Sequence, residues 1–289
     1  MKPARFGYTR PESVEEALDL LRRHGDEASV LAGGQSLMPM LNLRMARPAL
    51  LVDINRIPGL DRIEADDTGL MIGARARHAE VMTSRMAQKV APLLPLALAY
   101  VAHPAIRNRG TLGGSLSLAD PAAELPACAV CLSARIVLAS AQGTRHVEAG
   151  EFFQGIYATA LRPDEMVVRV EFPRPSSDWQ FVFLEVSRRH GDYAIAGIAL
   201  AARVIGGRIA ESRIVFCGLE AAPRRMAMIE SYLAGFSGAD GDSVAAAQEM
   251  LMREVAPIST AGFPSAYRLH LAGVLLRRAL DRIRLNGPA

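Results

Sequence analysis

The chain has 289 residues, of which 50% are hydrophobic and 22% charged, a composition typical of globular proteins and not of disordered ones. A formal net charge of only +3, with no run of Lys or Arg, disfavours nucleic-acid binding. We expect neither a transmembrane segment nor a secretory signal, and an odd number of cysteines, three, disfavours a disulfide framework, so we expect a cytoplasmic protein.

The first elements predict an α/β module. Ser13 and Glu16 form a capping box ahead of an amphipathic helix, and Gly25 follows that helix where a C-terminal cap belongs. A short apolar strand then leads into a glycine pair at 33–34, a helical stretch follows, and "ALLVDIN" (49–55) is a continuous apolar run typical of a buried strand. This order of elements favours parallel strand pairing.

Two further units follow in the chain. In the second, helical stretches between 78 and 102 separate strands at "GLMIGARA", "ARIVLAS" and "EMVVRVEF". After the Pro- and Ser-rich segment 173–178, three strands precede three amphipathic helices, and Gly206-Gly207 between the last two strands is a hairpin signal. Strands followed by helices predict a separate α+β domain, so we divide the chain into residues 1–57, 58–175 and 176–289.

Two glycine turns suggest a bound anion. "LAGGQSL" (31–37) and "RGTLGGSLS" (109–117) each place adjacent glycines where main-chain N–H groups can point at phosphate oxygens. Neither turn fits the P-loop or the Rossmann fingerprint. One such turn alone is more readily explained as a tight strand-to-helix connection, whereas two, in successive modules, favour a shared ligand.

Three segments together resemble a known family. Residues 31–57, 106–127 and 186–200 are similar to the FAD-binding medium subunit of molybdenum hydroxylases, a family that includes the flavoproteins of carbon monoxide dehydrogenase and xanthine dehydrogenase. The resemblance implies a vanillyl-alcohol-oxidase-type (PCMH-type) FAD-binding fold. That fold has two α/β subdomains and a C-terminal α+β domain in which helices accompany an antiparallel sheet.

The resemblance also implies which residues bind FAD. One wall of the pyrophosphate site would comprise Ala32, Gly33, Gly34, Gln35, Ser36 and Leu37, and the other Thr111, Gly113, Gly114 and Ser115. Asp120 and Glu124 would lie near the ribose and ribityl hydroxyls, with Glu124 the closer match to the family acid. Tyr193, in the loop "RRHGDY", would back the isoalloxazine ring, and some relatives carry Lys near Glu185.

Other chemistry-bearing residues have simpler interpretations. Arg107 and Arg109 could neutralise the pyrophosphate, or could hold their turn through carbonyl groups or face solvent. His103 is not assigned as a base. Cys128 and Cys131 have metal-ligand spacing, but three cysteines cannot build a four-cysteine site, so we interpret them as buried core thiols. No catalytic or metal-binding residue is assigned.

The resulting hypothesis is an electron-transfer flavoprotein subunit that is inactive on substrate alone. The resemblance implies a large molybdopterin subunit and a small subunit with two 2Fe–2S clusters as partners, in a hetero-oligomer such as a dimer of heterotrimers. Electrons would pass from the clusters to FAD and on to an external acceptor. A stand-alone flavin oxidoreductase of the same fold, or a non-catalytic nucleotide-binding protein, remains an alternative at this point.

Overall fold

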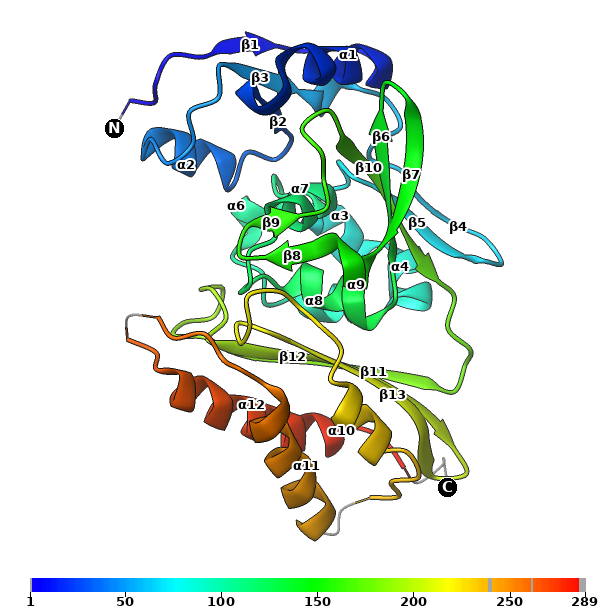
Figure 1. Ribbon diagram of the computed structural model, residues 1–289. Coiled ribbons are helices and arrows are strands. Elements are labelled where there is room, and N and C mark those ends of the chain that lie inside the picture. Colours follow the sequence, from blue (N-terminus) through cyan, green and yellow to red (C-terminus); the bar gives the residue numbers. More distant parts are fainter. Residues whose placement is uncertain (1, 239–240, 261, 286–289) are drawn as a thin grey trace.

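The N-terminal unit carries a small parallel sheet. The computed structural model describes residues 2–238, 241–260 and 262–285, and Figure 1 shows their arrangement. Strands β1 (Gly7–Thr9), β2 (Ala28–Leu31) and β3 (Leu50–Asp53) pair in parallel in the order β1-β3-β2. The helical elements are α1 (Val14–His24), α2 (Leu37–Asn42) and two short 3-10 turns, Gly25–Glu27 and Ile54–Arg56. The expected parallel pairing is confirmed.

Helix α1 begins and ends where the sequence predicts. Ser13 Oγ accepts a hydrogen bond from the Glu16 N–H at 3.1 Å, and Gly25, with φ of 49°, follows the last helical residue. The Glu16 carboxylate accepts from the N–H of Glu12 at 2.9 Å, one residue before the expected partner. The buried face of α1, Ala17, Leu18 and Leu21, packs with Val52 and Ile54 in the core of this unit.

The middle unit is built on an antiparallel sheet with the order β4-β5-β10-β6-β7. Its strands are β4 (Ile63–Ala65), β5 (Gly69–Gly73), β6 (Arg135–Ser140), β7 (Gly143–Glu148) and β10 (Met166–Pro173), with a separate hairpin of β8 (Phe153–Gly155) and β9 (Ala158–Thr159). Its helices are α3 (His78–Thr83), α4 (Arg85–Val90), α5 (Leu93–Leu98), α6 (Pro104–Arg107), α7 (Leu112–Leu118), α8 (Glu124–Cys131) and α9 (Ala149–Phe152). All the strand pairs of this sheet are antiparallel, unlike those of the first sheet.

The C-terminal unit is a three-stranded antiparallel sheet with helices on one face (Figure 1). It comprises β11 (Trp179–Val186), β12 (Ala196–Ile205), β13 (Arg208–Cys217), α10 (Ala227–Tyr232), α11 (Gly241–Glu254) and α12 (Ser265–Leu280). Gly206 and Gly207 join β12 to β13 with positive φ angles of 56° and 75°, as a type I′ hairpin requires. The expected α+β architecture is confirmed.

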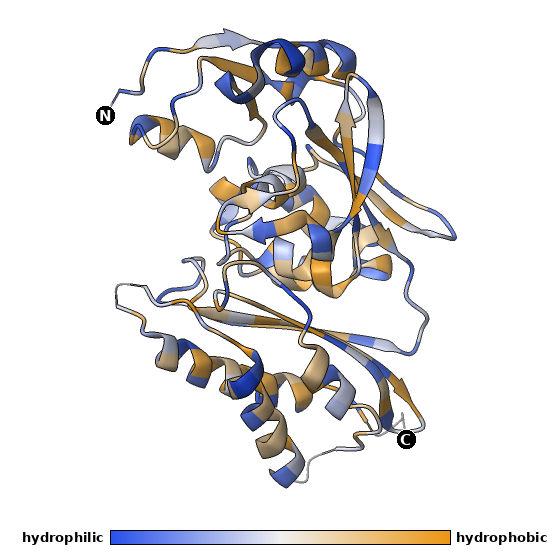
Figure 2. Ribbon diagram, in the orientation of Figure 1, coloured by the Kyte–Doolittle hydropathy of each residue, from blue (hydrophilic) through white to orange (hydrophobic). Residues whose placement is uncertain are grey.

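The C-terminal sheet is buried on both faces, which joins it firmly to the middle unit. Side chains along β12 alternate between the two faces of the sheet. Ile198 and Leu200 pack against the C-terminal helices, whereas Ala199 and Ala201 pack against the core of the middle unit. Figure 2 shows hydrophobic segments in this sheet and in the helices that flank it. All three cysteines are free and buried, which confirms the interpretation as core thiols. In the described ranges, no helix is long and apolar enough to span a membrane.

Candidate cofactor site

The two glycine turns are in backbone contact. A Cβ added to Gly33 would overlap the carbonyl oxygen of Arg109 and would lie 3.0 Å from the Gly110 Cα. Gly33 follows β2 in the first unit, whereas Arg109 and Gly110 precede α7 in the second. Only glycine allows this approach, so the motif positions the two units against each other as well as shaping a turn.

The first turn presents unpaired main-chain donors. In the structure, none of the described residues accepts a hydrogen bond from the N–H groups of Gly33, Gly34, Gln35 or Ser36. Gly34 has a φ of 71°, and the Gln35 side chain donates to the Gly33 carbonyl at 3.1 Å. Successive free N–H groups in a turn form a concavity that suits an anion.

The second turn uses its glycines differently. The Gly113 N–H donates to the Ala74 carbonyl at 2.8 Å, and a Cβ on Gly113 would meet the Ala74 Cβ at 2.5 Å, so this glycine packs α7 against the end of β5. The Gly114 N–H donates to Thr111 Oγ1 at 3.1 Å, and Gly114 itself is exposed. The second turn therefore offers an open surface at Gly114 beside a tightly packed Gly113.

Two side chains that sequence reasoning missed connect the turns. Asn55 Nδ2 donates to the Ala32 carbonyl at 2.8 Å, and its Oδ1 accepts from Arg77 Nη2 at 2.6 Å. Arg77 Nη1 also donates to the Arg109 carbonyl. Arg77 and Asn55 thus tie the first turn to the second through their side chains.

Asp53 anchors this network. Its Oδ1 accepts from the N–H and the Nδ2 of Asn55 at 2.9 and 2.6 Å, and Tyr8 donates to its Oδ2 at 2.5 Å. Burial opposes ionisation, but the hydrogen bonds from Tyr8 and Asn55 outweigh it and hold the pKa of Asp53 below its usual range. "DIN" begins at the last residue of the buried parallel strand β3, where polar side chains gather at ligand sites, and that position could have revealed the network.

The basic residues near the second turn have separate roles. Arg107 Nη1 donates to the carbonyls of Val101 and Ala102 at 2.8 and 3.1 Å, so Arg107 holds the turn that precedes α6. Arg109 is exposed, and its side chain has neither a hydrogen bond nor an ion pair to any described residue. His103 is exposed at the N-cap of α6.

A buried histidine lies under the second turn. A Cβ on Gly110 would meet His78 Cε1 and Nδ1 at 2.9 Å, and neither ring nitrogen of His78 has a hydrogen-bond partner among the described residues. Burial lowers the pKa of His78 to about 4. The imidazole is therefore neutral at physiological pH and supports the turn as a packing group.

Acidic and aromatic side chains of the middle and C-terminal units lie near one another. Asp120 Oδ1 accepts from the Ala122 N–H at 2.9 Å, and the Tyr157 hydroxyl lies 3.4 Å from Asp120 Oδ2. Partial desolvation, followed by the carboxylates of Asp120 and Glu124, raises the pKa of the Tyr193 hydroxyl. The structure thus brings Asp120, Glu124 and Tyr193 together and adds Tyr157, which sequence reasoning missed.

The Tyr193 ring is 71% exposed, so Tyr193 is not a core residue of this chain. The loop that carries it rests on the segment between α5 and α6. Gly191, with φ of 87°, approaches so closely that a Cβ would lie 2.5 Å from the Ala102 carbonyl oxygen, and the His190 ring lies 6.1 Å from that of Tyr100. A well-anchored loop therefore presents an exposed aromatic ring beside the two acids.

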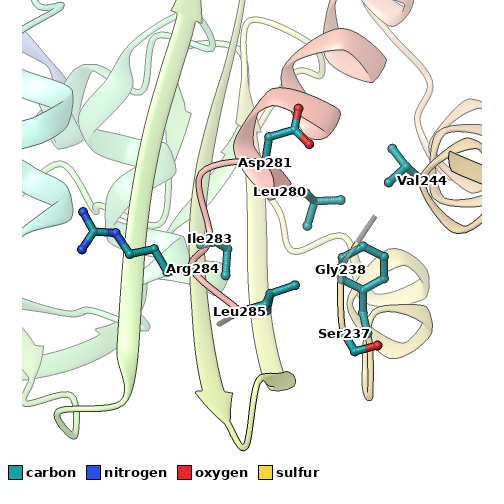
Figure 3. Close-up of a pocket in the computed structure, with 9 residues that line it drawn as sticks. Ser237, Gly238, Val244, Leu280, Asp281, Ile283, Arg284 and Leu285 are labelled. Carbon is teal, nitrogen blue, oxygen red and sulfur yellow. The ribbon is translucent and has the colours of Figure 1, made fainter. Parts of the chain in front are cut away.

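The predicted cofactor residues line neither of two cavities in the described part of the chain. One, of about 590 Å³, lies at the end of α12 and includes Phe236, Leu280 and Leu285; Figure 3 shows its lining. The other, of about 330 Å³, is lined by residues such as Cys131, Trp179 and Arg213. The glycine turns instead meet where the first two units contact each other, through Gly33 and the Arg109 carbonyl.

Comparisons with known proteins show which family the chain is similar to. Residues 4–175 match the family described as FAD binding domain in molybdopterin dehydrogenase, and residues 181–283 match the CO dehydrogenase flavoprotein C-terminal domain. The chain is 41% identical to the 6-hydroxypseudooxynicotine dehydrogenase complex subunit alpha of Paenarthrobacter nicotinovorans, over 98% of this chain and 95% of that one. It is 34% identical to the carbon monoxide dehydrogenase medium chain of Hydrogenophaga pseudoflava, over 97% and 98%.

Solved structures match over nearly the whole chain. Carbon monoxide dehydrogenase from Hydrogenophaga pseudoflava superimposes with a TM-score of 0.94 at 35% identity, covering 97% of this chain and 98% of that one. Quinoline 2-oxidoreductase from Pseudomonas putida 86 gives a TM-score of 0.92 at 36% identity, covering 98% of both chains.

Fold and site together define a FAD-binding oxidoreductase subunit. More particularly, the chain belongs to the family of FAD-binding medium subunits of molybdenum hydroxylases, which includes the carbon monoxide dehydrogenase and xanthine dehydrogenase flavoproteins. The resemblance, the fold class and FAD as the cofactor are therefore confirmed, and so is the interpretation as an electron-transfer subunit rather than either alternative.

Proposed function

We propose that this chain holds FAD across its two glycine turns and relays electrons from the iron–sulfur clusters of a partner subunit to an external acceptor. The observation that carries the proposal is the contact of Gly33 with Arg109 and Gly110, beside four unpaired N–H groups of the first turn. Main-chain donors that converge on one concavity fit a pyrophosphate. We also propose the division into residues 1–57, 58–175 and 176–289, in which the two turns form a cradle for FAD at the boundary of the first two units.

The proposed roles follow from the position of each group. The first wall comprises Ala32, Gly33, Gly34, Gln35, Ser36 and Leu37, and the second comprises Thr111, Gly113, Gly114 and Ser115. Bound FAD supplies the redox chemistry. The free N–H groups from Gly33 to Ser36 orient its phosphates, and Arg77 and Asn55 fix the distance between the walls. Asp120 and Glu124 accept hydrogen bonds from its hydroxyls, and the Tyr193 ring shields it from water.

We further propose a cytoplasmic complex with a large molybdopterin subunit and a small iron–sulfur subunit, assembled as a dimer of heterotrimers. The names of similar proteins support a multi-subunit assembly, since they are called complex subunit alpha, medium chain and medium subunit. Three free thiols agree with a reducing compartment.

The first prediction tests the electron-transfer role. We expect the purified chain to bind FAD and to accept electrons from dithionite, because the cradle lies within this chain. We also expect it to hydroxylate no substrate without its partners. Absorbance of the flavin during anaerobic titration, together with product analysis, provides the measurement. Hydroxylation by a preparation free of molybdenum and iron would contradict the proposal.

The second prediction concerns Tyr193. Aromatic stacking adds about 0.5–1.5 kcal/mol beyond burial of area, so Tyr193→Ala should weaken FAD binding roughly two- to twelvefold. Water beside the ring would also favour the charged reduced form, and the flavin potential should rise. Tyr193→Phe keeps the ring, so its FAD affinity and flavin potential should be nearly those of the wild type.

Because the Tyr193 ring is exposed, Tyr193→Ala should leave the melting temperature of the FAD-free chain almost unchanged. Titration with FAD, the flavin potential and thermal unfolding of both variants give the comparison. Unaltered affinity and potential in Tyr193→Ala would remove Tyr193 from the site.

A further inference from the structure

Two glutamates from different domains meet at the edge of the cofactor site. Glu124 is the first residue of α8 in the FAD-binding part of the chain, and Glu185 lies near the end of β11 in the C-terminal domain. Helix α8 packs against β12 and β13, and β11 lies beside β12 in the same sheet, which brings the two side chains close enough to interact. Glu124 is only 8% exposed, and both carboxylate oxygens of Glu185 are buried without a hydrogen-bond partner among the described residues.

The packing around the pair holds these groups together. Glu185 pairs with Gly197 in the neighbouring strand, and Gly197 pairs with Cys217 in the next. A Cβ on Gly197 would meet Cys217 Sγ at 2.6 Å and Glu185 Cγ at 3.6 Å. The missing side chain at Gly197 therefore leaves room for the Cys217 thiol, and Glu185 lies at ordinary contact distance beside it.

The other groups that face the pair do not neutralise two negative charges. Asp120 and Tyr193 lie on the Glu124 side, with Tyr157 beside Asp120, and Cys217 lies beside Glu185. Burial keeps the Cys217 thiol neutral, because it raises the pKa well above the usual value. The Ser187 hydroxyl donates to the Arg189 carbonyl at 2.8 Å.

A shared proton resolves this arrangement. Two ionised carboxylates are only hydrogen-bond acceptors, and in a buried site they repel each other. One proton between them turns the pair into a donor and an acceptor. Burial raises the pKa of Glu124 to about 7, and burial together with the Glu124 carboxylate raises the pKa of Glu185 to about 8.

We propose that Glu124 and Glu185 share one proton, and that Glu185 is thereby a positioning residue that holds the Glu124 carboxyl in place beside the cofactor. This inference rests on the proposed function, in which Glu124 faces the hydroxyls of FAD. While the proton is present, the pair is a hydrogen bond between the two domains. When it is lost, repulsion displaces Glu124 and the affinity for FAD falls.

The sign of the pH dependence follows from the raised pKa values. The folded chain keeps a proton that the unfolded chain releases near pH 4.3, the usual value for Glu. The pair's contribution to stability is therefore complete below that pH and is lost as the pH rises through about 7 to 8. Binding of FAD needs the protonated pair and therefore weakens over the same range.

Glu185→Gln tests the proposal because an amide donates to Glu124 at every pH. We expect the dissociation constant of FAD to rise about tenfold between pH 7 and pH 9 in the wild type, as expected for one linked proton. It should stay nearly constant in Glu185→Gln. Glu151→Gln, which alters an exposed carboxylate on α9, is the matched control and should keep the wild-type profile.

Thermal unfolding of the FAD-free chain supplies a second measurement. The wild type should lose stability relative to Glu185→Gln as the pH rises from 6 to 9. Glu124→Gln should give the same result as Glu185→Gln, so it replaces that variant if Glu185→Gln folds poorly. Parallel pH profiles of wild type and Glu185→Gln in both measurements would overturn the inference. A wild type that binds no FAD at any pH would instead contradict the proposed function, while the unfolding profiles would still decide whether the proton is shared.

Discussion

A Gly33→Val chain should fold but lose at least about a hundredfold in FAD affinity, which corresponds to about 2.7 kcal/mol. The added side chain would overlap the Arg109 carbonyl and force the two turns apart. Hydrogen bonds to charged groups contribute about 1.5–3 kcal/mol each, so the loss of two phosphate contacts accounts for this effect. The purified variant should be almost colourless, and a fluorescence titration with FAD measures its dissociation constant.

Two other glycines sharpen this experiment. Gly150→Ala is the matched control, because nothing lies within 4 Å of a Cβ at that position on α9, and it should bind FAD normally. Gly114→Val should also fold and be largely colourless, since a Cβ there meets only the side-chain atom Thr111 Oγ1, at 2.7 Å, and the residue is exposed. Full FAD occupancy in both valine variants would refute a shared cradle.

Arg77→Gln is expected to weaken FAD binding about 10- to 100-fold and to destabilise the chain by about 1–3 kcal/mol. Arg77 donates to Asn55 Oδ1 and to the Arg109 carbonyl, and its loss leaves both acceptors without this partner. The turns would no longer be held at a fixed separation, although no group that contacts the phosphates changes. Melting temperature and FAD titration measure the two effects.

A charge-conserving variant separates position from charge. Arg77→Lys keeps the positive charge but lacks the planar fork that reaches two acceptors, so it should resemble Arg77→Gln. Arg62→Gln removes an exposed arginine whose ion pair with Glu64 spans 3.6 Å, and it should have little effect. Normal FAD affinity in Arg77→Lys would show that charge alone matters at this position.

Local signals predicted most of the fold. Ser13 and Gly25 bracket α1 because capping depends on the residues next to a helix end. Strand β7 was missed because it is an edge strand whose six residues include only one buried side chain, so it has no apolar alternation. The antiparallel order of the second sheet depends on which strands meet after folding, and no local pattern specifies that.

The same distinction applies to the site. The sequence alone determined where the glycine turns lie, because glycine occurs at the positions where the fold has no room for a side chain. Three motifs in order also determined the family. Only the tertiary structure decided that Gly33 contacts Arg109, that Arg77 reaches Asn55, and that Glu185 faces Glu124. These pairs join residues from separate units of the chain. Their hydrogen bonds and raised or lowered pKa values come from burial and proximity, which exist only once the units have packed together.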